Sequence, residues 1–277
     1  MRAGTRGTRD GGPADGGVLD VTAFGADQSG TKPSDAAINS AIMVNNARGG
    51  DSTIMFPPGV YRVDAPLLPI VGQNVAIEGH GALVEWRNTT EHSCLLTFGA
   101  IGERRTALVS DVVAGSDSIE LASEVNVGEL VRLNSSEMYY NSTQDSTRRN
   151  KKGELIIGVF ETQCPSETVT QCGQTRAPGP VLFPDGKSPI FGYSKTLTSA
   201  TIITPSTNLA IRGLAIRGAG AHWLTVAIAV DGARGVVIDG CSFEQIMAGI
   251  GVSSSHLVQI TNSRFNRIDH VRECAIT

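Results

Sequence analysis

Two segments in the second half of the chain repeat one pattern with a constant shift of 22 residues. VVIDGCSF at 236–243 superposes on VQITNSRF at 258–265, and AIAV at 227–230 superposes on GIGV at 249–252. An earlier copy, LAIRGLAI at 209–216, matches at a shift of 27. Each unit is too short for a domain and alternates apolar with small or polar residues, as half-buried strands do. Turns of this length, with connections too short for helices, predict strands stacked in parallel as a β-helix.

The repeat also predicts where the bends and the interior lie. Gly213, Gly240 and Asn262 fall at the same place between two strands of successive turns. Because Gly and Asn tolerate left-handed backbone angles, we expect these bends to stack as a ladder. Phe243 and Phe265 occupy equivalent positions, so we expect their rings to stack inside the coil.

The composition agrees with a chain that turns often and excludes several classes of protein. Glycine accounts for 32 of 277 residues, and only 18% of the residues are charged. A hydrophobic content of 40% is enough for a sizeable core and excludes wholesale disorder. No run of about 18 apolar residues is present for membrane insertion. A net charge of −4 does not favour nucleic acid as a partner.

The chain divides into a leader and one long domain. Residues 1–17 carry three arginines with no apolar stretch behind them, so we expect a flexible leader rather than a secretory signal. Residues 18–277 are expected to form a single β-helix domain that opens with a strand at 18–24 and includes a strand segment at 74–86.

A helix is expected near the start of this domain. The spacing of Ile38, Ala41 and Ile42 predicts an amphipathic helix over 34–47, with Ser34 as N-cap and a glycine pair at its end. The open end of a solenoid exposes unpaired strand edges and core side chains, so we expect this helix to cap the N-terminal end.

Between about residues 106 and 200 the period is lost, which predicts an irregular excursion made of further strands. A polar run at 138–153 is expected to be a mobile loop, and its arginines and lysines either grip an anionic polymer or are simply solvated. Cys164 and Cys172 lie close together and would clip a loop in an oxidising compartment. Since no zinc-ligand spacing is present, no metal and no cofactor are expected.

The stretch VTAFGADQSGTKPSDAAINSAI, followed by GGDSTIMFPPGVYRV, resembles the opening of pectate-lyase-like right-handed parallel β-helix proteins. That superfamily includes bacteriophage tailspikes and capsule depolymerases, and the later VGELVRLNSSE and TNLAIRGLAIRG look like the tailspike branch. The resemblance implies an all-β, right-handed parallel β-helix that faces glycans outside the cell or on a virion. It further implies a frequent homotrimer that often cleaves polysaccharide by hydrolysis or β-elimination.

The catalytic signatures of well-known members are incomplete in this chain. The triplet Gly79, His80, Gly81 is similar to one polygalacturonase motif but stands before any of the aspartates that should precede it. VVIDGCSF resembles a pectate lyase strand in which Asp239 is kept and Gly240 replaces the expected histidine. The resemblance therefore does not imply a calcium–pectate mechanism here.

The connections between successive turns indicate where a groove could lie, because they are long, short and then long. Loops 217–227 and 266–275 would stand about 10 Å apart across one short connection, a width that suits a sugar chain. The floor between them would be bare, since its outward positions are Ala229, Gly251 and Ala275.

Candidate catalytic groups lie on one wall of this groove and between the walls. Glu244 and Asp269, one turn apart, would supply the acid and the carboxylate that glycoside hydrolysis needs, with either stereochemical outcome. For β-elimination, His270 would act as the base while Arg272 neutralises a uronate carboxylate. Glu273 lies on the same wall.

Candidate substrate-binding residues are His222, Trp223, Asp231 and Arg272. An indole offers a flat apolar face to a sugar ring, so Trp223 is the expected platform. The alternative for each polar residue is a solvated loop position or, for Asp231 before Gly232, a turn.

Together these features predict a tailspike-like depolymerase of a bacterial surface polysaccharide. The alternative is a glycan-binding or structural protein of a virion or cell surface without catalysis. Residues 273–277, ECAIT, match the first strand of another turn, so we expect the chain either to be a fragment or to have its last turn covered by a partner.

Overall fold

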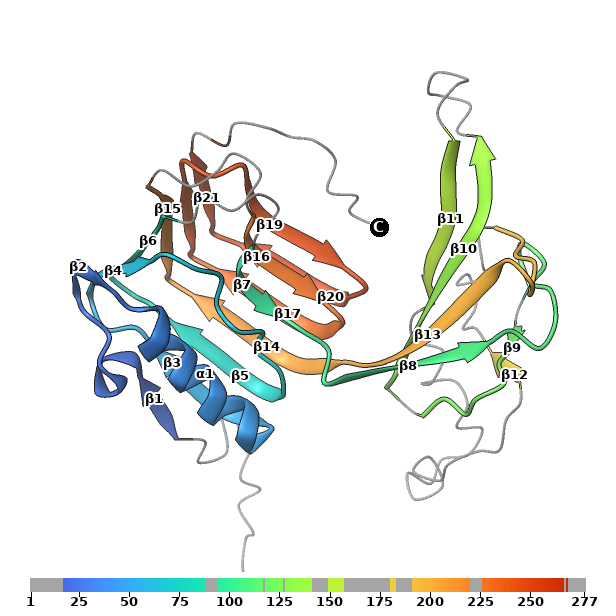
Figure 1. Ribbon diagram of the computed structural model, residues 1–277, viewed down its shortest axis with the longest axis horizontal. Helices are drawn as coiled ribbons and strands as arrows, with labels where there is room; N and C mark the ends of the chain where they lie inside the picture. The colour runs from blue at the N-terminus through green and yellow to red at the C-terminus, as the bar shows by residue number, and fades with distance from the viewer. Residues whose placement is uncertain are drawn as a thin grey trace, which may run out of the picture.

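The structure is a computed structural model that describes residues 17–87, 94–116, 118–126, 128–140, 149–156, 180–182, 191–219, 226–266 and 268. The described strands form a parallel β-helix with a smaller antiparallel unit beside it (Figure 1). Three parallel sheets make up the β-helix. Each described turn adds one strand to the first sheet and one to the second, and three of these turns also add one to the third.

The first sheet has the order β1 (Val18–Asp20), β3 (Gly50–Met55), β5 (Gln73–Glu78), β14 (Ser206–Arg212), β17 (Ala233–Asp239) and β20 (His256–Thr261). The second sheet has the order β2 (Ser29–Pro33), β4 (Gly59–Val63), β6 (Ala82–Trp86), β15 (Ala215–Gly218), β18 (Ser242–Glu244) and β21 (Arg264–Asn266). The third sheet has the order β7 (Cys94–Phe98), β16 (Val226–Asp231) and β19 (Ala248–Ser253).

The strand register confirms the repeat predicted from the sequence. Val236 pairs with Val258, and Ile228 pairs with Ile250, both at the shift of 22. Leu209 pairs with Val236 at the shift of 27. Because side chains of one column point the same way in every turn, the inward columns form one continuous apolar core.

The predicted ladder of bends is also confirmed. Gly213, Gly240 and Asn262 have φ angles of 64°, 62° and 50°, all in the left-handed region. The backbone N–H of Gly213 donates to the carbonyl of Asp239 at 3.0 Å, and that of Gly240 donates to Thr261 at 3.1 Å. Each bend therefore bonds to the next turn.

A pair of substitutions separates backbone strain from steric contact at these bends. A Cβ at Gly213 would lie 2.2 Å from Nδ1 of His80, whereas at Gly240 the nearest atom would be 3.9 Å away. We expect Gly240→Ala to cost about 1 kcal/mol through its positive φ, and Gly213→Ala to cost about 1 kcal/mol more. Chemical denaturation measures both. Equal losses would mean that the His80 ring swings aside freely.

The predicted cap is present as helix α1 (Asp35–Arg48), which packs on β3 over the N-terminal turn (Figure 1). Ile38, Ala41 and Ile42 are buried in the core of the β-helix. Ser34 is the N-cap residue, but its hydroxyl makes no bond to the helix and instead accepts from the backbone N–H of Asp27 at 3.0 Å.

The excursion is an antiparallel unit inserted between β7 and β14. The chain leaves the β-helix through β8 (Gly102–Ala107) and returns through β13 (Thr198–Thr204), which pair with each other. A four-stranded sheet has the order β11 (Arg149–Ile156), β10 (Leu130–Tyr140), β13, β8, and β12 (Pro180–Leu182) pairs with β9 (Ser118–Glu120). This unit buries its own apolar cluster, which includes Val131, Leu133 and Ile202.

Four details differ from the sequence expectations. The two ends of the polar run at 138–153, expected to be a mobile loop, lie in β10 and β11, and residues 141–148 lie outside the described residues. The expected strand at 18–24 is β1 followed by a 3-10 helix, η1 (Val21–Phe24). The segment at 74–86 is two strands, β5 and β6, because the backbone bends at its glycines. Phe265 stacks on Phe243 with ring centroids 4.9 Å apart, but it is 47% exposed. It lies on β21, which is the last strand of its sheet among the described residues.

Candidate functional site

Most residues predicted for the groove lie outside the described residues. They are His222, Trp223, Asp269, His270, Arg272, Glu273 and Ala275. Cys164, Cys172 and residues 1–16 of the expected leader at 1–17 also lie outside. Glu244, Asp231, Ala229 and Gly251 are described, so the structure locates part of the expected floor and two of the expected site residues.

Two of the three residues expected for the floor, Ala229 and Gly251, lie on the outer face of the third sheet. Ala229 lies between Thr97 on one side and Gly251 on the other. All three residues are partly exposed. Neighbouring strands lie about 4.8 Å apart, so these small side chains leave a flat strip three strands wide along which an extended polymer can contact the backbone.

Asp231 stands at one end of this strip, on the same strand as Ala229 and directly opposite Ser253. Its Oδ1 atom is buried and has no hydrogen-bond partner in the described structure. Buried carboxylate oxygens are nearly always hydrogen-bonded. Of the expected site residues that the structure describes, Asp231 therefore has the clearest signature of an incomplete contact.

Glu244 belongs to a ladder of alternating charges on the second sheet. Arg62, Glu85, Arg217, Glu244 and Asn266 pair in that order across five strands. Arg217 forms its ion pair with Glu85 rather than Glu244. The carboxylate of Glu244 accepts a hydrogen bond from the Asn266 amide at 3.4 Å, so it is only weakly held and remains available to a ligand.

The two motif fragments similar to polygalacturonases and pectate lyases lie together on the first sheet, away from the third. His80 lies 3.2 Å from Glu78, which also pairs with Arg212. Asp239 accepts from the hydroxyl of Thr261 and the amide of Asn262, and these bonds lower the pKa of its carboxyl. An anionic aspartate tied to the next turn serves to hold the bend.

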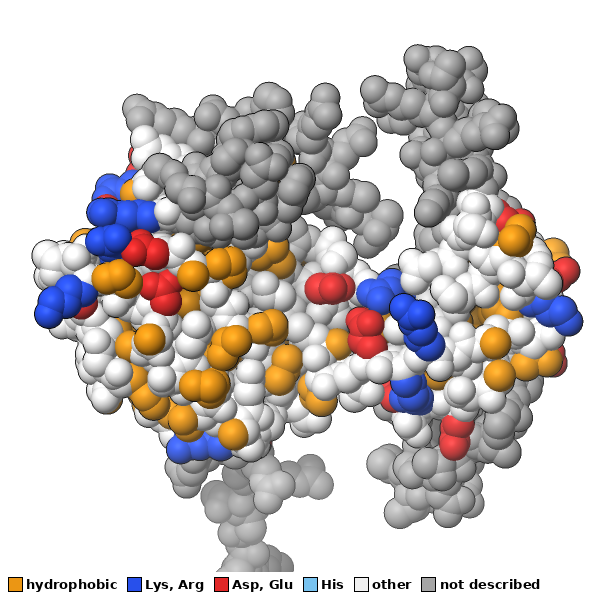
Figure 2. Space-filling model, in the orientation of Figure 1, with side chains coloured by type: hydrophobic (Ala, Val, Ile, Leu, Met, Phe, Trp, Pro, Cys, Tyr) orange, Lys and Arg blue, Asp and Glu red, His pale blue; other side chains and the backbone are white. Residues whose placement is uncertain are grey.

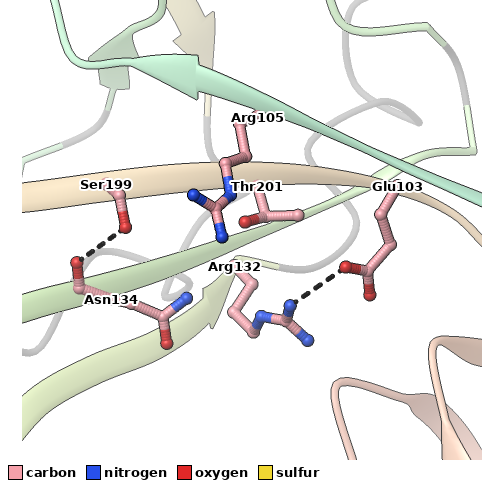
Figure 3. A pocket seen from close by; sticks show the side chains of 6 residues that line it. All are labelled: Glu103, Arg105, Arg132, Asn134, Ser199 and Thr201. Carbon is pink, nitrogen blue, oxygen red and sulfur yellow. Dashed lines mark hydrogen bonds and ion pairs between the residues drawn. The ribbon is translucent and has the colours of Figure 1, made fainter.

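A pocket of about 440 Å³ lies on the antiparallel unit and was not predicted from the sequence. Its lining residues come from β8, β10 and β13, and they point toward one another in Figure 3. They are Glu103, Arg105, Arg132, Asn134, Ser199 and Thr201. Figure 2 shows basic and acidic side chains gathered over this part of the surface. The only local signal is the alternation of polar and apolar residues in part of β10 and of β13.

The pocket adjoins the β-helix near Asp231. Arg132 donates a hydrogen bond to Ser254 at 2.9 Å, and Ser254 directly follows β19. Ile203, on β13, lies against the bend at Gly232, where a Cβ would be 3.2 Å from its Cγ2 atom. The pocket and the small-residue strip thus meet at one end of the third sheet.

Neither thiols nor metal ligands contribute a site in the described part of the chain. Cys94 and Cys241 are free, and burial raises the pKa of both thiols, which disfavours the reactive thiolate. No group of three or more His, Cys, Asp or Glu side chains is placed there to hold a metal ion. Nor is any helix in that part long and apolar enough to span a bilayer.

Residues 18–94 match the family model described as rhamnogalacturonase A/epimerase, pectate lyase-like. This match contains the stretch on which the resemblance to pectate-lyase-like β-helix proteins was based. A search of curated proteins finds no match.

Solved phage tailspikes share the fold. The tailspike protein gp49 of Pseudomonas phage LKA1 superposes with a TM-score of 0.63 at 14% identity, covering 90% of this chain and 43% of that one. The tailspike gp61 of Pseudomonas phage phi297 gives 0.56 at 11% identity, covering 90% and 48%. The gp54 tailspike of Acinetobacter baumannii phage AP22, in complex with a capsular saccharide, gives 0.50 at 12% identity, covering 85% and 36%.

These matches confirm the predicted architecture, a right-handed parallel β-helix similar to that of phage tailspikes. The chain spans less than half the length of each of these tailspikes.

Proposed function

We propose, on the premise that this chain has the pectate-lyase-like β-helix fold of phage tailspikes, that it is a depolymerase of a bacterial surface polysaccharide. The observation that carries the proposal is the backbone similarity to tailspikes over most of the chain, one of them bound to a capsular saccharide. A location on a virion or another extracellular surface, and assembly as a homotrimer, belong to the same proposal.

The small-residue strip of Thr97, Ala229 and Gly251 supports it, because a flat surface without bulky side chains accommodates an extended sugar chain. In the hydrolytic form of the proposal, Glu244 and Asp269 are the catalytic pair. In the eliminating form, His270 is the base and Arg272 neutralises the uronate. His222, Trp223 and Asp231 bind substrate in both.

One assay on a panel of capsular polysaccharides and exopolysaccharides tests the proposal and distinguishes its forms. New reducing ends with absorbance of an unsaturated uronate indicate a lyase, and new reducing ends alone indicate a hydrolase. Binding without new ends indicates the second candidate, a non-catalytic glycan-binding protein. The position of Glu244 favours that candidate, because a carboxylate between Arg217 and Asn266 in a row of paired side chains has a structural role without catalysis.

Substitution of the proposed pair gives the sharper test. Glu244→Gln and Asp269→Asn keep the shape of each side chain but remove its acid–base function, so we expect kcat to fall by about 100-fold or more. Glu120→Gln is a matched control, since Glu120 is exposed on β9 of the antiparallel unit. Full activity in both site variants would eliminate this pair.

A further inference from the structure

The pocket on the antiparallel unit is built by three neighbouring strands whose polar side chains share one face. Thr201 of β13 pairs with Arg105 of β8 on one side and with Arg132 of β10 on the other. In the adjacent row, Ser199 pairs with Asn134. The opposite face carries the apolar cluster of the unit, so the sheet separates a buried face from a polar one.

The two arginines of this row differ in their partners. Arg132 pairs with Glu103 at 3.2 Å and bonds to Ser254 at 2.9 Å. Arg105 is exposed and makes no hydrogen bond or ion pair with any residue that the structure describes. One carboxylate therefore faces two guanidinium groups, and the pocket carries a net positive charge.

Arg104, the residue directly before Arg105, does have a carboxylate partner. Arg104, on the other face of β8, is bound by both carboxylate oxygens of Glu129 and by the carbonyl of Glu124. Arg105 and Arg132 lie on either side of Thr201, and of the two only Arg132 has a carboxylate partner among the described residues. An unpaired Arg105 on the same face of the sheet as Arg132 favours an anionic ligand, which supplies the charge partner that Arg105 lacks.

Neutral hydrogen-bonding groups complete the lining. The Ser199 hydroxyl donates to the backbone carbonyl of Asn134 at 3.3 Å, which fixes the row beside the arginines. The side-chain amide of Asn134 and the hydroxyl of Thr201 line the same cavity. Planar guanidinium groups recognise carboxylates through paired hydrogen bonds, and amide and hydroxyl groups suit the hydroxyls of a sugar ring.

We infer that this pocket binds the carboxylate of an acidic sugar residue, with Arg105 as its main contact. The inference rests on the proposed function, because it assigns an acidic polysaccharide as the substrate class. The pocket adjoins the small-residue strip through Arg132 and Ser254, so one polymer can contact both. It is a binding subsite and takes no part in bond cleavage.

Calorimetric titration of the full chain with short oligogalacturonate, oligomannuronate and oligoglucuronate tests the inference, each compared with its carboxyl-reduced form. We expect at least one acidic oligosaccharide to bind and its neutral counterpart to bind at least ten-fold more weakly. Raising the ionic strength should weaken the acidic ligand only. Equal binding of acidic and neutral forms, or no binding of any acidic form, would overturn the inference.

Variants locate the contact. Arg105→Gln should weaken binding of the acidic oligosaccharide about ten-fold, and Arg105→Lys should keep part of it. Arg48→Gln, which removes the same charge from an exposed position on α1, should bind as the parent does. Wild-type affinity in Arg105→Gln would place the ligand elsewhere.

The acidic-sugar subsite and the depolymerase function can be contradicted independently of each other. Cleavage of a polysaccharide with unchanged KM in Arg105→Gln would overturn this inference and leave the proposed function intact. Binding through Arg105 without cleavage of any polymer would support the inference and contradict the depolymerase.

Discussion

Replacement of Phe243 by alanine should lower the free energy of unfolding by about 3–5 kcal/mol, the loss expected when a fully buried aromatic ring leaves a cavity. Phe243 is 1% exposed. Its ring stacks on Phe265 with an interplanar angle of 14°, and both rings pack against Gly249. Urea denaturation monitored by circular dichroism measures the loss.

Phe265→Ala is the matched control because the same ring is removed from the equivalent position one turn later. Since Phe265 is 47% exposed, its removal should cost about 1–2 kcal/mol. Equal losses for the two variants would mean that the last described turn is covered as completely as the interior. A loss within experimental error for Phe243→Ala would contradict the observed packing.

Glu129→Gln should destabilise the antiparallel unit by about 2–3 kcal/mol, less than for a fully buried ion pair because Arg104 is partly exposed. Glu129 is 5% exposed. Its carboxylate binds Arg104 and accepts from the backbone N–H of Asn126 at 2.7 Å and from the hydroxyl of Thr204 at 3.0 Å. Hydrogen exchange in β8 and β13 should report the loss, while exchange in β5 and β14 should not change.

The contribution of Glu129 should also depend on pH. Burial by itself raises the pKa of this carboxyl, but the bonds from Arg104, Asn126 and Thr204 outweigh it and hold the pKa below its ordinary value of 4.5. A pKa that is lower in the folded than in the unfolded state adds stability above the unfolded value and loses it as the pH falls through the folded value.

The stability difference between the parent chain and Glu129→Gln should therefore be constant near neutral pH and shrink below about pH 4.5. Glu120→Gln, at an exposed site of the same unit, should show no comparable change. A difference between parent and Glu129→Gln that is independent of pH would contradict the ion pair as the source of stability.

The β-helix could be predicted because its register is periodic in the sequence. A constant shift between 236–243 and 258–265 translates directly into paired strands, and Gly213 and Gly240 mark the bends by their need for positive φ. The shift between β5 and β14, by contrast, is 134 residues, since Val75 pairs with Leu209 across the inserted unit. No short-range repeat could reveal that pairing.

The pocket could not be predicted for a related reason. Arg105 and Thr201 become neighbours only when β8 and β13 pair antiparallel, and nothing in either strand specifies that long-range register. The approach of Ile203 to the bend at Gly232 likewise depends on the inserted unit packing there. The outward positions of Ala229 and Gly251 could be predicted, because both residues lie within the periodic part of the sequence.

Hydrogen exchange with and without a bound acidic polysaccharide is the most direct test of the central claim, that the chain binds polysaccharide along the third sheet and in the adjoining pocket of the antiparallel unit. We predict slower exchange in β8, the edge strand of the described antiparallel sheet, and in β19 with the turn at Ser254. Protection confined to the first sheet, or no protection with any polysaccharide of the panel, would contradict the account.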